Sequence, residues 1–156
     1  MKLAEALALR ADATRRVEQL RARAVGSARY QEGEEPAEDA AQLLAETGEV
    51  LDELESLIRR INRTNTVAEL STGGTLTDAL ARRDVLRLRH AVISSAADAA
   101  AGRDQHGVVR QLRSELKMLS ALPVAELRSQ ADVLAREIRE VDIRIQQANW
   151  EVDLLD

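Results

Sequence analysis

The side chains that could carry acid–base or metal chemistry are few in this chain. His90 and His106 are its only histidines, and neither follows a glutamate at the three-residue spacing that di-iron helical bundles use. There is no cysteine, which excludes disulfides and thiolate ligands. The sequence also contains no G-x-S-x-G nucleophile motif, no Walker A loop and no G-x-G-x-x-G loop. We therefore expect no enzymatic activity, no cofactor and no bound metal.

The pattern around each histidine suggests a structural position. A histidine at a helix contact is the favoured interpretation of His90, and a ligand or a pH-sensitive contact is the alternative. His106 falls in a short polar loop, where a solvated side chain is the simplest expectation.

Five carboxylates crowd one stretch of predicted helix. Their spacing is more typical of the solvated face of a helix than of a catalytic pair or a metal site. The five residues are Glu46, Glu49, Asp52, Glu53 and Glu55.

A set of arginines is the one positive cluster, and it suggests a polyanion contact such as an RNA backbone. The alternative is pairing with nearby Asp and Glu, and two observations favour it. The net charge is -5, which weighs against a general affinity for nucleic acid. Tyr30 and Trp150 are the only aromatic residues, so almost no side chain is suited to stack on a base. Nucleic acid is therefore an unlikely partner. The seven candidate residues are Arg59, Arg60, Arg63, Arg82, Arg83, Arg87 and Arg89.

The amino-acid composition limits the kinds of secondary structure that could position these residues. With 156 residues, 31% of them charged, 1% aromatic and none of them Phe, the core must consist of Leu, Ile, Val and Ala. Such a composition is typical of helical bundles. No run approaches 18 apolar residues and the first residues lack the apolar segment of a signal peptide, so we expect a cytoplasmic protein without membrane contact.

A heptad repeat near the C-terminus is the strongest structural signal. A strict 3-4 spacing of apolar residues requires a partner helix along its length. Pro123 would open this helix, because a proline at the first helical position sacrifices no hydrogen bond. The ten residues of the repeat are Val124, Leu127, Ala131, Leu134, Ile138, Val141, Ile145, Ala148, Val152 and Leu155.

Three further helices are predicted upstream, over about residues 2–28, 37–61 and 75–101. The second has an apolar stripe wide enough to contact two neighbours, and the third has two separate stripes. In the second helix the main stripe is Ala40, Leu44, Thr47, Leu51, Leu54, Ile58 and Ile61, widened by Leu43, Val50 and Leu57. In the third helix one stripe is Ala81, Val85, Leu88, Val92, Ala96 and Ala99, and the other is Leu86, His90, Ile93, Ala97 and Ala100.

Two segments interrupt the helical period. Residues 62–70 are rich in Thr, Asn and Val, and residues 107–122 fit either a strand or a helix. We favour a strand at 112–121 that pairs with part of 62–70, because each segment would otherwise leave backbone groups without partners. The prediction is thus a mainly α fold in a single domain over residues 1–156. It is a long antiparallel helical bundle or coiled coil of about four helices with a small β hairpin or short sheet.

Several sequence blocks, taken together, resemble a known family. They are MKLAEALALRAD, QEGEEPAED, RINRTN, TLTDALARRDVLRLR and QANWEVDL. As a set they are similar to small bacterial proteins often labelled septicolysin. The resemblance implies a pore-forming cytolysin, although the sequence has no segment able to cross a bilayer.

A second apolar stripe on the back of the last helix predicts a homo-oligomer. Ile143, Trp150 and Leu154 lie at spacings of seven and four, away from the heptad repeat, and one neighbour cannot cover opposite faces. The alternative is that another helix of the same chain covers them. The function favoured by the sequence is an oligomeric scaffold or interaction module, and an RNA-binding arm and a membrane-active cytolysin are the other hypotheses.

Overall fold

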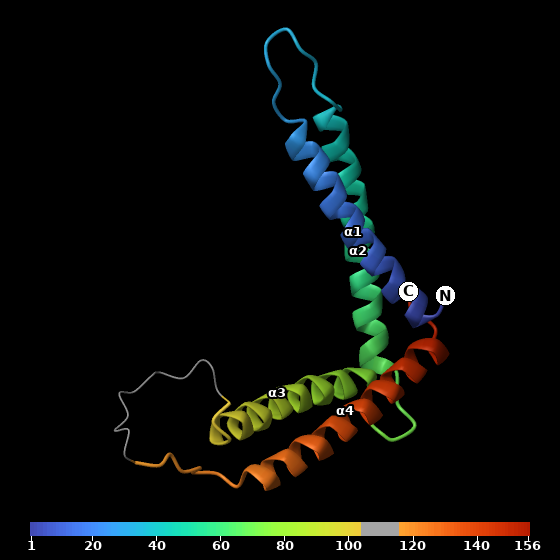
Figure 1. Cartoon of the computed structure of the whole chain (residues 1–156). Coiled ribbons are helices and arrows are strands. Elements are labelled where there is room, and N and C mark those ends of the chain that lie inside the picture. Colours follow the sequence, from blue (N-terminus) through green and yellow to red (C-terminus); the bar gives the residue numbers. More distant parts are fainter. Residues whose placement is uncertain (104–115) are drawn as a thin grey trace. The chain divides into compact units, whose positions relative to one another are not determined.

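The computed structural model describes residues 1–103 and 116–156. In these residues the chain forms four helices, namely α1 (Leu3–Gly26), α2 (Ala40–Val67), α3 (Leu76–Ala100) and α4 (Val124–Glu151) (Figure 1). They belong to two compact units. Unit 1 comprises Met1–Leu76 and Gln146–Asp156, and unit 2 comprises Thr77–Ile145. The predicted four helices are therefore confirmed.

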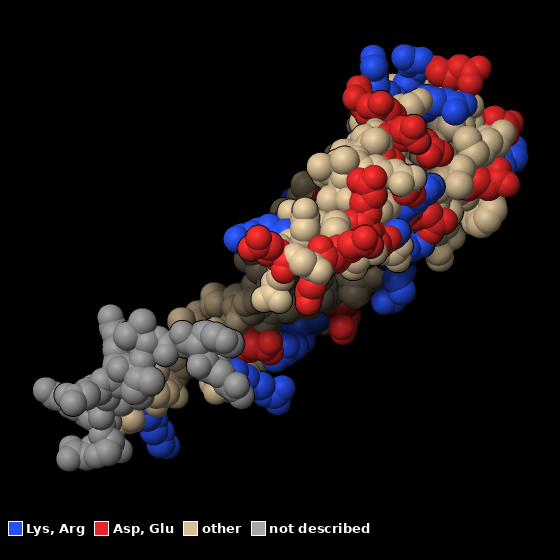
Figure 2. Space-filling view, turned by 90° about the horizontal axis from the view of Figure 1, so that it is seen from above, with Lys and Arg blue, Asp and Glu red and all other residues tan. Residues whose placement is uncertain are grey.

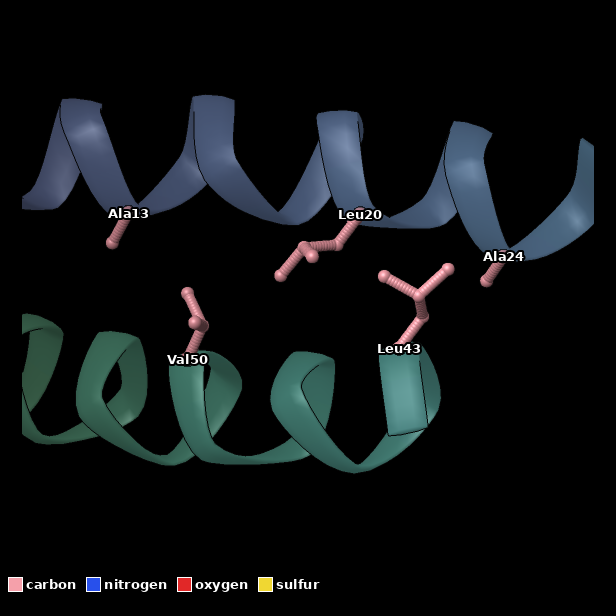
Figure 3. Packing of buried hydrophobic residues seen from close by; sticks show 5 residues of the cluster. All are labelled: Ala13, Leu20, Ala24, Leu43 and Val50. Atoms are coloured by element: carbon pink, nitrogen blue, oxygen red, sulfur yellow. The ribbon is translucent and has the colours of Figure 1, made fainter. Parts of the chain in front are cut away.

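In unit 1, α1 and α2 form an antiparallel hairpin. Side chains of α1 point directly toward side chains of α2 and form an apolar cluster (Figure 3). Opposite charges flank this cluster: Arg16 donates to Glu46 at 2.7 Å, and Arg23 pairs with Glu38. The buried residues of the cluster are Ala13, Leu20, Ala24, Leu43 and Val50.

Asp39 fixes the start of α2. One of its carboxylate oxygens accepts hydrogen bonds from the backbone N–H groups of Ala41 at 3.0 Å and Gln42 at 3.1 Å. These are two of the donors that a helix leaves without partners in its first turn. The acidic loop before α2 therefore ends in a side chain that defines the helix boundary.

The end of the chain is fastened to both helices of unit 1. Backbone hydrogen bonds join Leu3 N to Val152 O at 3.0 Å and Leu154 N to Met1 O at 2.9 Å. On the other side, Leu155 N donates to the side-chain hydroxyl of Thr64 in α2 at 3.0 Å. Lys2 also forms an ion pair with Asp153 at 2.9 Å. We call these contacts of residues 1–3 and Thr64 with residues 151–156 the terminal clasp.

In unit 2, α3 and α4 lie side by side in antiparallel orientation (Figure 1). The predicted heptad repeat faces inward, since Leu127, Ala131 and Val141 of α4 are buried. On α3, Leu86 and Ala97 are buried as well. Helix α3 thus supplies a partner for the part of the repeat that lies in unit 2. The helix ends at Glu151, however, and the last residue of the predicted repeat, Leu155, is exposed beyond it.

The predicted small sheet is wrong in the described part of the chain. Helix α2 continues to Val67, and Leu70 N and Gly74 O close a turn before α3. Residues 1–103 and 116–156 contain only two isolated bridges and no strand. Residues 112–115 of the predicted strand lie outside the described residues.

Helix α2 continues past residue 61 because the hydroxyl groups of its threonines find hydrogen-bond acceptors within the helix. Thr64 donates its hydroxyl to Arg60 O at 2.8 Å, and Thr66 donates to Arg63 O at 2.7 Å. Thr64 and Ile61 are also buried on the inner face of α2. Burial and local hydrogen bonds therefore override the weak strand preference of these residue types.

Candidate interaction surfaces

The residues first considered for chemistry lie apart from one another. His90 is half-buried on α3, and His106 lies outside the described residues. Among the α2 carboxylates, Glu46 pairs with Arg16, and Glu55 pairs with Arg59. In the described ranges no group of three or more His, Cys, Asp or Glu side chains is placed to hold a metal ion. These carboxylates line the outer surface of a hairpin.

The seven candidate arginines fall into two groups in different units. In unit 1, Arg59 pairs with Glu55 at 3.4 Å, while Arg60 and Arg63 bind Asp156. The Arg60 guanidinium also donates to Leu155 O at 3.0 Å, which draws both arginines into the terminal clasp.

The unit 2 arginines are engaged in the same way. Arg82 reaches Glu137 at 3.0 Å, and both Arg83 and Arg87 bind Asp142. Arg89 is the one member of the set with neither an ion pair nor a side-chain hydrogen bond to a described residue. On the face shown in Figure 2, acidic and basic side chains alternate with uncharged surface and form no continuous basic area.

Ion pairs in unit 1 shift the pKa of two exposed carboxyls. Hydrogen bonding from Arg23 lowers the pKa of Glu38, and hydrogen bonding and charge from Lys2 lower the pKa of Asp153. Lys2 also donates to Glu151 O, at the carboxyl end of α4, where a cation is favourable. Both pKa shifts therefore result from ion pairs that stabilise the structure, one in the α1–α2 hairpin and one in the terminal clasp.

Helix α3 has two apolar faces, and only one of them is covered. The stripe that contains Leu86 packs toward α4, whereas the other stripe is open to solvent. On the open stripe, the exposed fraction is 53% for Val85, 68% for Leu88 and 66% for Val92. We call these three residues the α3 open face. Together they continue a 3-4 spacing that has no partner helix among the described residues.

Helix α2 repeats this arrangement in unit 1. The residues that were expected only to widen its stripe, Leu43, Val50 and Leu57, are buried, and Leu43 and Val50 pack against α1. Three members of the expected main stripe are exposed and lie seven residues apart. They are Leu44, Leu51 and Ile58, and we call them the α2 open face.

Two shallow grooves accompany these helices. The one in unit 2 has a volume of about 390 Å³ and runs between α3 and α4. The one in unit 1 has a volume of about 400 Å³, is polar, and lies along the α2 arginines. The unit 2 groove is lined by Arg89, Ile93, Ser129, Gln130, Val133 and Leu134.

The predicted oligomer contact on α4 is only partly exposed. Ile143 and Trp150 are exposed, but Leu154 is 9% exposed and donates its N–H to Met1 O. Because α4 ends at Glu151, Leu154 leaves the helical stripe and joins the terminal clasp. The open part of this surface therefore consists of Ile143 and Trp150.

Known proteins share both the sequence and the arrangement of these helices. The profile of DUF6847, a family of unknown function, matches residues 10–154. The chain belongs to this family. A crystal structure of a functionally unknown conserved protein from Corynebacterium diphtheriae is 41% identical to the DUF6847 protein, with 99% of each chain covered and a TM-score of 0.90. No curated protein matches the chain.

These matches overturn the resemblance to septicolysin-labelled proteins. Neither the DUF6847 family nor the Corynebacterium protein carries that label. The blocks behind the resemblance are short pieces of amphipathic helix and polar loop, which many helical proteins share. In the described ranges, no helix is long and apolar enough to cross a membrane.

Proposed function

We propose that this DUF6847 protein is an interaction module that assembles into an oligomeric scaffold through open helix faces. The α3 open face carries the proposal. Its three aliphatic residues are each more than half exposed and repeat at heptad spacing, beside a stripe of the same helix that α4 already covers. An exposed apolar stripe of this kind is typical of a surface that binds another helix.

The expected strength of such a contact can be worked out. Full burial of a Val or Leu side chain contributes about 1.5 to 3 kcal/mol, so the remaining exposed part contributes about 1 to 2 kcal/mol. A symmetric contact buries six of these side chains and gains about 6 to 12 kcal/mol, while association costs about 4 to 15 kcal/mol. The net free energy of association through the α3 open face alone is therefore close to zero. A stable assembly needs a second contact, for which Ile143 and Trp150 are candidates.

The proposal involves no catalytic step, no cofactor and no nucleic acid. Five of the seven candidate arginines are ion-paired to described residues of their own unit, and Arg63 donates a hydrogen bond to Asp156 O, which leaves little positive charge for a polyanion. The absence of cysteine favours the cytoplasm as the compartment in which this scaffold works.

Sedimentation equilibrium over a wide range of concentrations tests the proposal. We expect the wild type to exceed the monomer mass and Leu88→Glu to lower the association constant at least tenfold, with helicity unchanged by circular dichroism. Ala125→Glu is the matched control, because it adds the same charge at an exposed position of α4. A wild type that remains monomeric at every concentration, or a Leu88→Glu variant that assembles normally, would refute a role for the α3 open face.

A further inference from the structure

We infer that the α2 open face binds the α2 helix of a second copy of this chain in antiparallel orientation. In this contact Leu51 meets Ile58 of the second copy, and Asp52 meets Arg59 of the second copy. The inference rests on the proposed function, since it names the partner for one of the open faces.

Apolar side chains lie on two neighbouring sides of α2. One side of the helix is filled, because Leu43 and Val50 pack against α1. The neighbouring side carries Leu44, Leu51 and Ile58, which are exposed at 38% to 64%. Residues seven apart lie along one side of a helix and can face a single partner helix over their whole length. The α2 open face therefore has the geometry of a second helix–helix contact.

Charge along α2 selects the identity and direction of that partner. In α2, residues 40–58 contain five acidic residues and no Lys or Arg, and the five residues that follow contain Arg59, Arg60 and Arg63. A parallel second copy would place acidic residues beside acidic residues. An antiparallel copy places the acidic part of each helix beside the arginines of the other, which is the complementary arrangement.

The hairpin leaves part of this charge unbalanced at the edge of the open face. Arg16 and Arg23 of α1 already pair with Glu46 and Glu38. Asp52 has no ion pair with any described residue. Arg59 has only an exposed pair with Glu55 at 3.4 Å, in which both side chains are about 70% exposed. Asp52 and Arg59 are thus available to a second copy.

A single register satisfies both contacts. In an antiparallel contact the two-fold axis lies midway between paired residues, which is between Leu54 and Glu55 for the first pair and between Glu55 and Ser56 for the second. The two positions differ by one residue, or about 1.5 Å along the helix. A two-fold axis near Glu55 therefore brings both pairs together and repeats each of them, as an isologous interface requires. Gly48 then faces Asn62 of the second copy. A Cβ atom added at Gly48 would meet nothing within 4 Å in its own chain, so packing within unit 1 does not explain a glycine in mid-helix.

Cysteine cross-linking of the full chain tests the register, because the protein has no cysteine of its own. Leu51→Cys and Ile58→Cys are prepared as separate proteins and oxidised alone and mixed. We expect a disulfide-linked dimer to form at least tenfold faster in the mixture than in either sample alone. Faster cross-linking of each variant with itself would indicate a parallel contact and overturn the inference.

A charge exchange provides an independent test in solution. Asp52→Arg and Arg59→Asp should each lower the association constant at least tenfold, because each places like charges together twice, and the double variant should recover most of the loss. Equal losses in the single and double variants would contradict the pairing. The outcomes are separable from those of Leu88→Glu. Suppose that the Leu88→Glu variant associates at least tenfold more weakly than the wild type, and that the mixed cysteine variants do not cross-link. The proposed function then stands and this inference fails.

Discussion

Thr64 contributes one hydroxyl to the terminal clasp, and replacing Thr64 with valine isolates the contribution of that hydroxyl. The side chain is fully buried. Its hydroxyl donates to Arg60 O at 2.8 Å and accepts from Leu155 N at 3.0 Å. Valine has nearly the same shape, so Thr64→Val removes the hydrogen bonds and leaves the packing in place.

The expected loss follows from the groups that remain. A buried N–H without an acceptor costs about 1 to 3 kcal/mol. The hydrogen bond between the Leu155 amide and Thr64 is only partly buried, so water can replace part of the lost interaction, and we expect the lower part of that range, about 1 to 2 kcal/mol. Arg60 O loses little, because a helical carbonyl also accepts the backbone N–H four residues on.

Thr64→Ser is the matched control. It keeps both hydrogen bonds and removes one methyl group, at a cost of about 1 kcal/mol before any cavity is counted. The two variants therefore have similar overall losses but differ locally. Amide hydrogen exchange of Leu155 should be at least fivefold faster in Thr64→Val and nearly unchanged in Thr64→Ser. Full protection of the Leu155 amide in Thr64→Val would refute the role assigned to this hydroxyl.

Three further measurements test other contacts. Asp39→Ala should destabilise the protein by about 1 kcal/mol in chemical denaturation, because two backbone donors of α2 lose their acceptor, whereas Asp39→Asn should retain most of the stability. Lys2→Met should raise the carboxyl pKa of Asp153 in an NMR titration. Since Lys2 lowers that folded-state pKa, the stabilisation is present above the unfolded-state pKa and is lost as pH falls through the folded-state pKa, and an unshifted Asp153 would contradict the pairing. Trp150, the sole tryptophan, is exposed, and its emission should move to shorter wavelength with rising protein concentration if α4 takes part in assembly, while a constant emission maximum would exclude Trp150 from the contact.

The sequence was most informative where one apolar stripe is long and unbroken. The heptad repeat of α4 predicted both a helix and a buried face, and residues from Leu127 to Ala148 follow it. The repeat overran the helix because residues 152–155 continue the apolar spacing after Glu151, where the backbone turns to bind α1. Spacing alone does not show where a helix ends, since backbone partners elsewhere in the chain decide it.

Where two stripes compete, the sequence could not choose between them. In α2, Leu43, Val50 and Leu57 have the same spacing as Leu44, Leu51 and Ile58 and similar side chains. Only the position of α1 decides which set is buried, and that depends on contacts between residues far apart in the chain. The breadth of the stripe was visible in the sequence and led us to expect two neighbours. In the described residues α1 covers one side of it, and the other side is exposed.

The terminal clasp also bears on the order in which the protein folds. Unit 1 is discontinuous, because its two parts are separated in sequence by the whole of unit 2. During synthesis, α1 and α2 can pair as soon as they leave the ribosome, but Thr64 and Lys2 must wait for residues 151–156. The bonds that they then form span 91 and 149 residues. Closing loops of that length is slow compared with pairing the helices of a hairpin. Nascent chains should therefore hold a formed α1–α2 hairpin while the inner face of α2 near Thr64 is still uncovered, and this is the stage at which the chain most needs protection from aggregation.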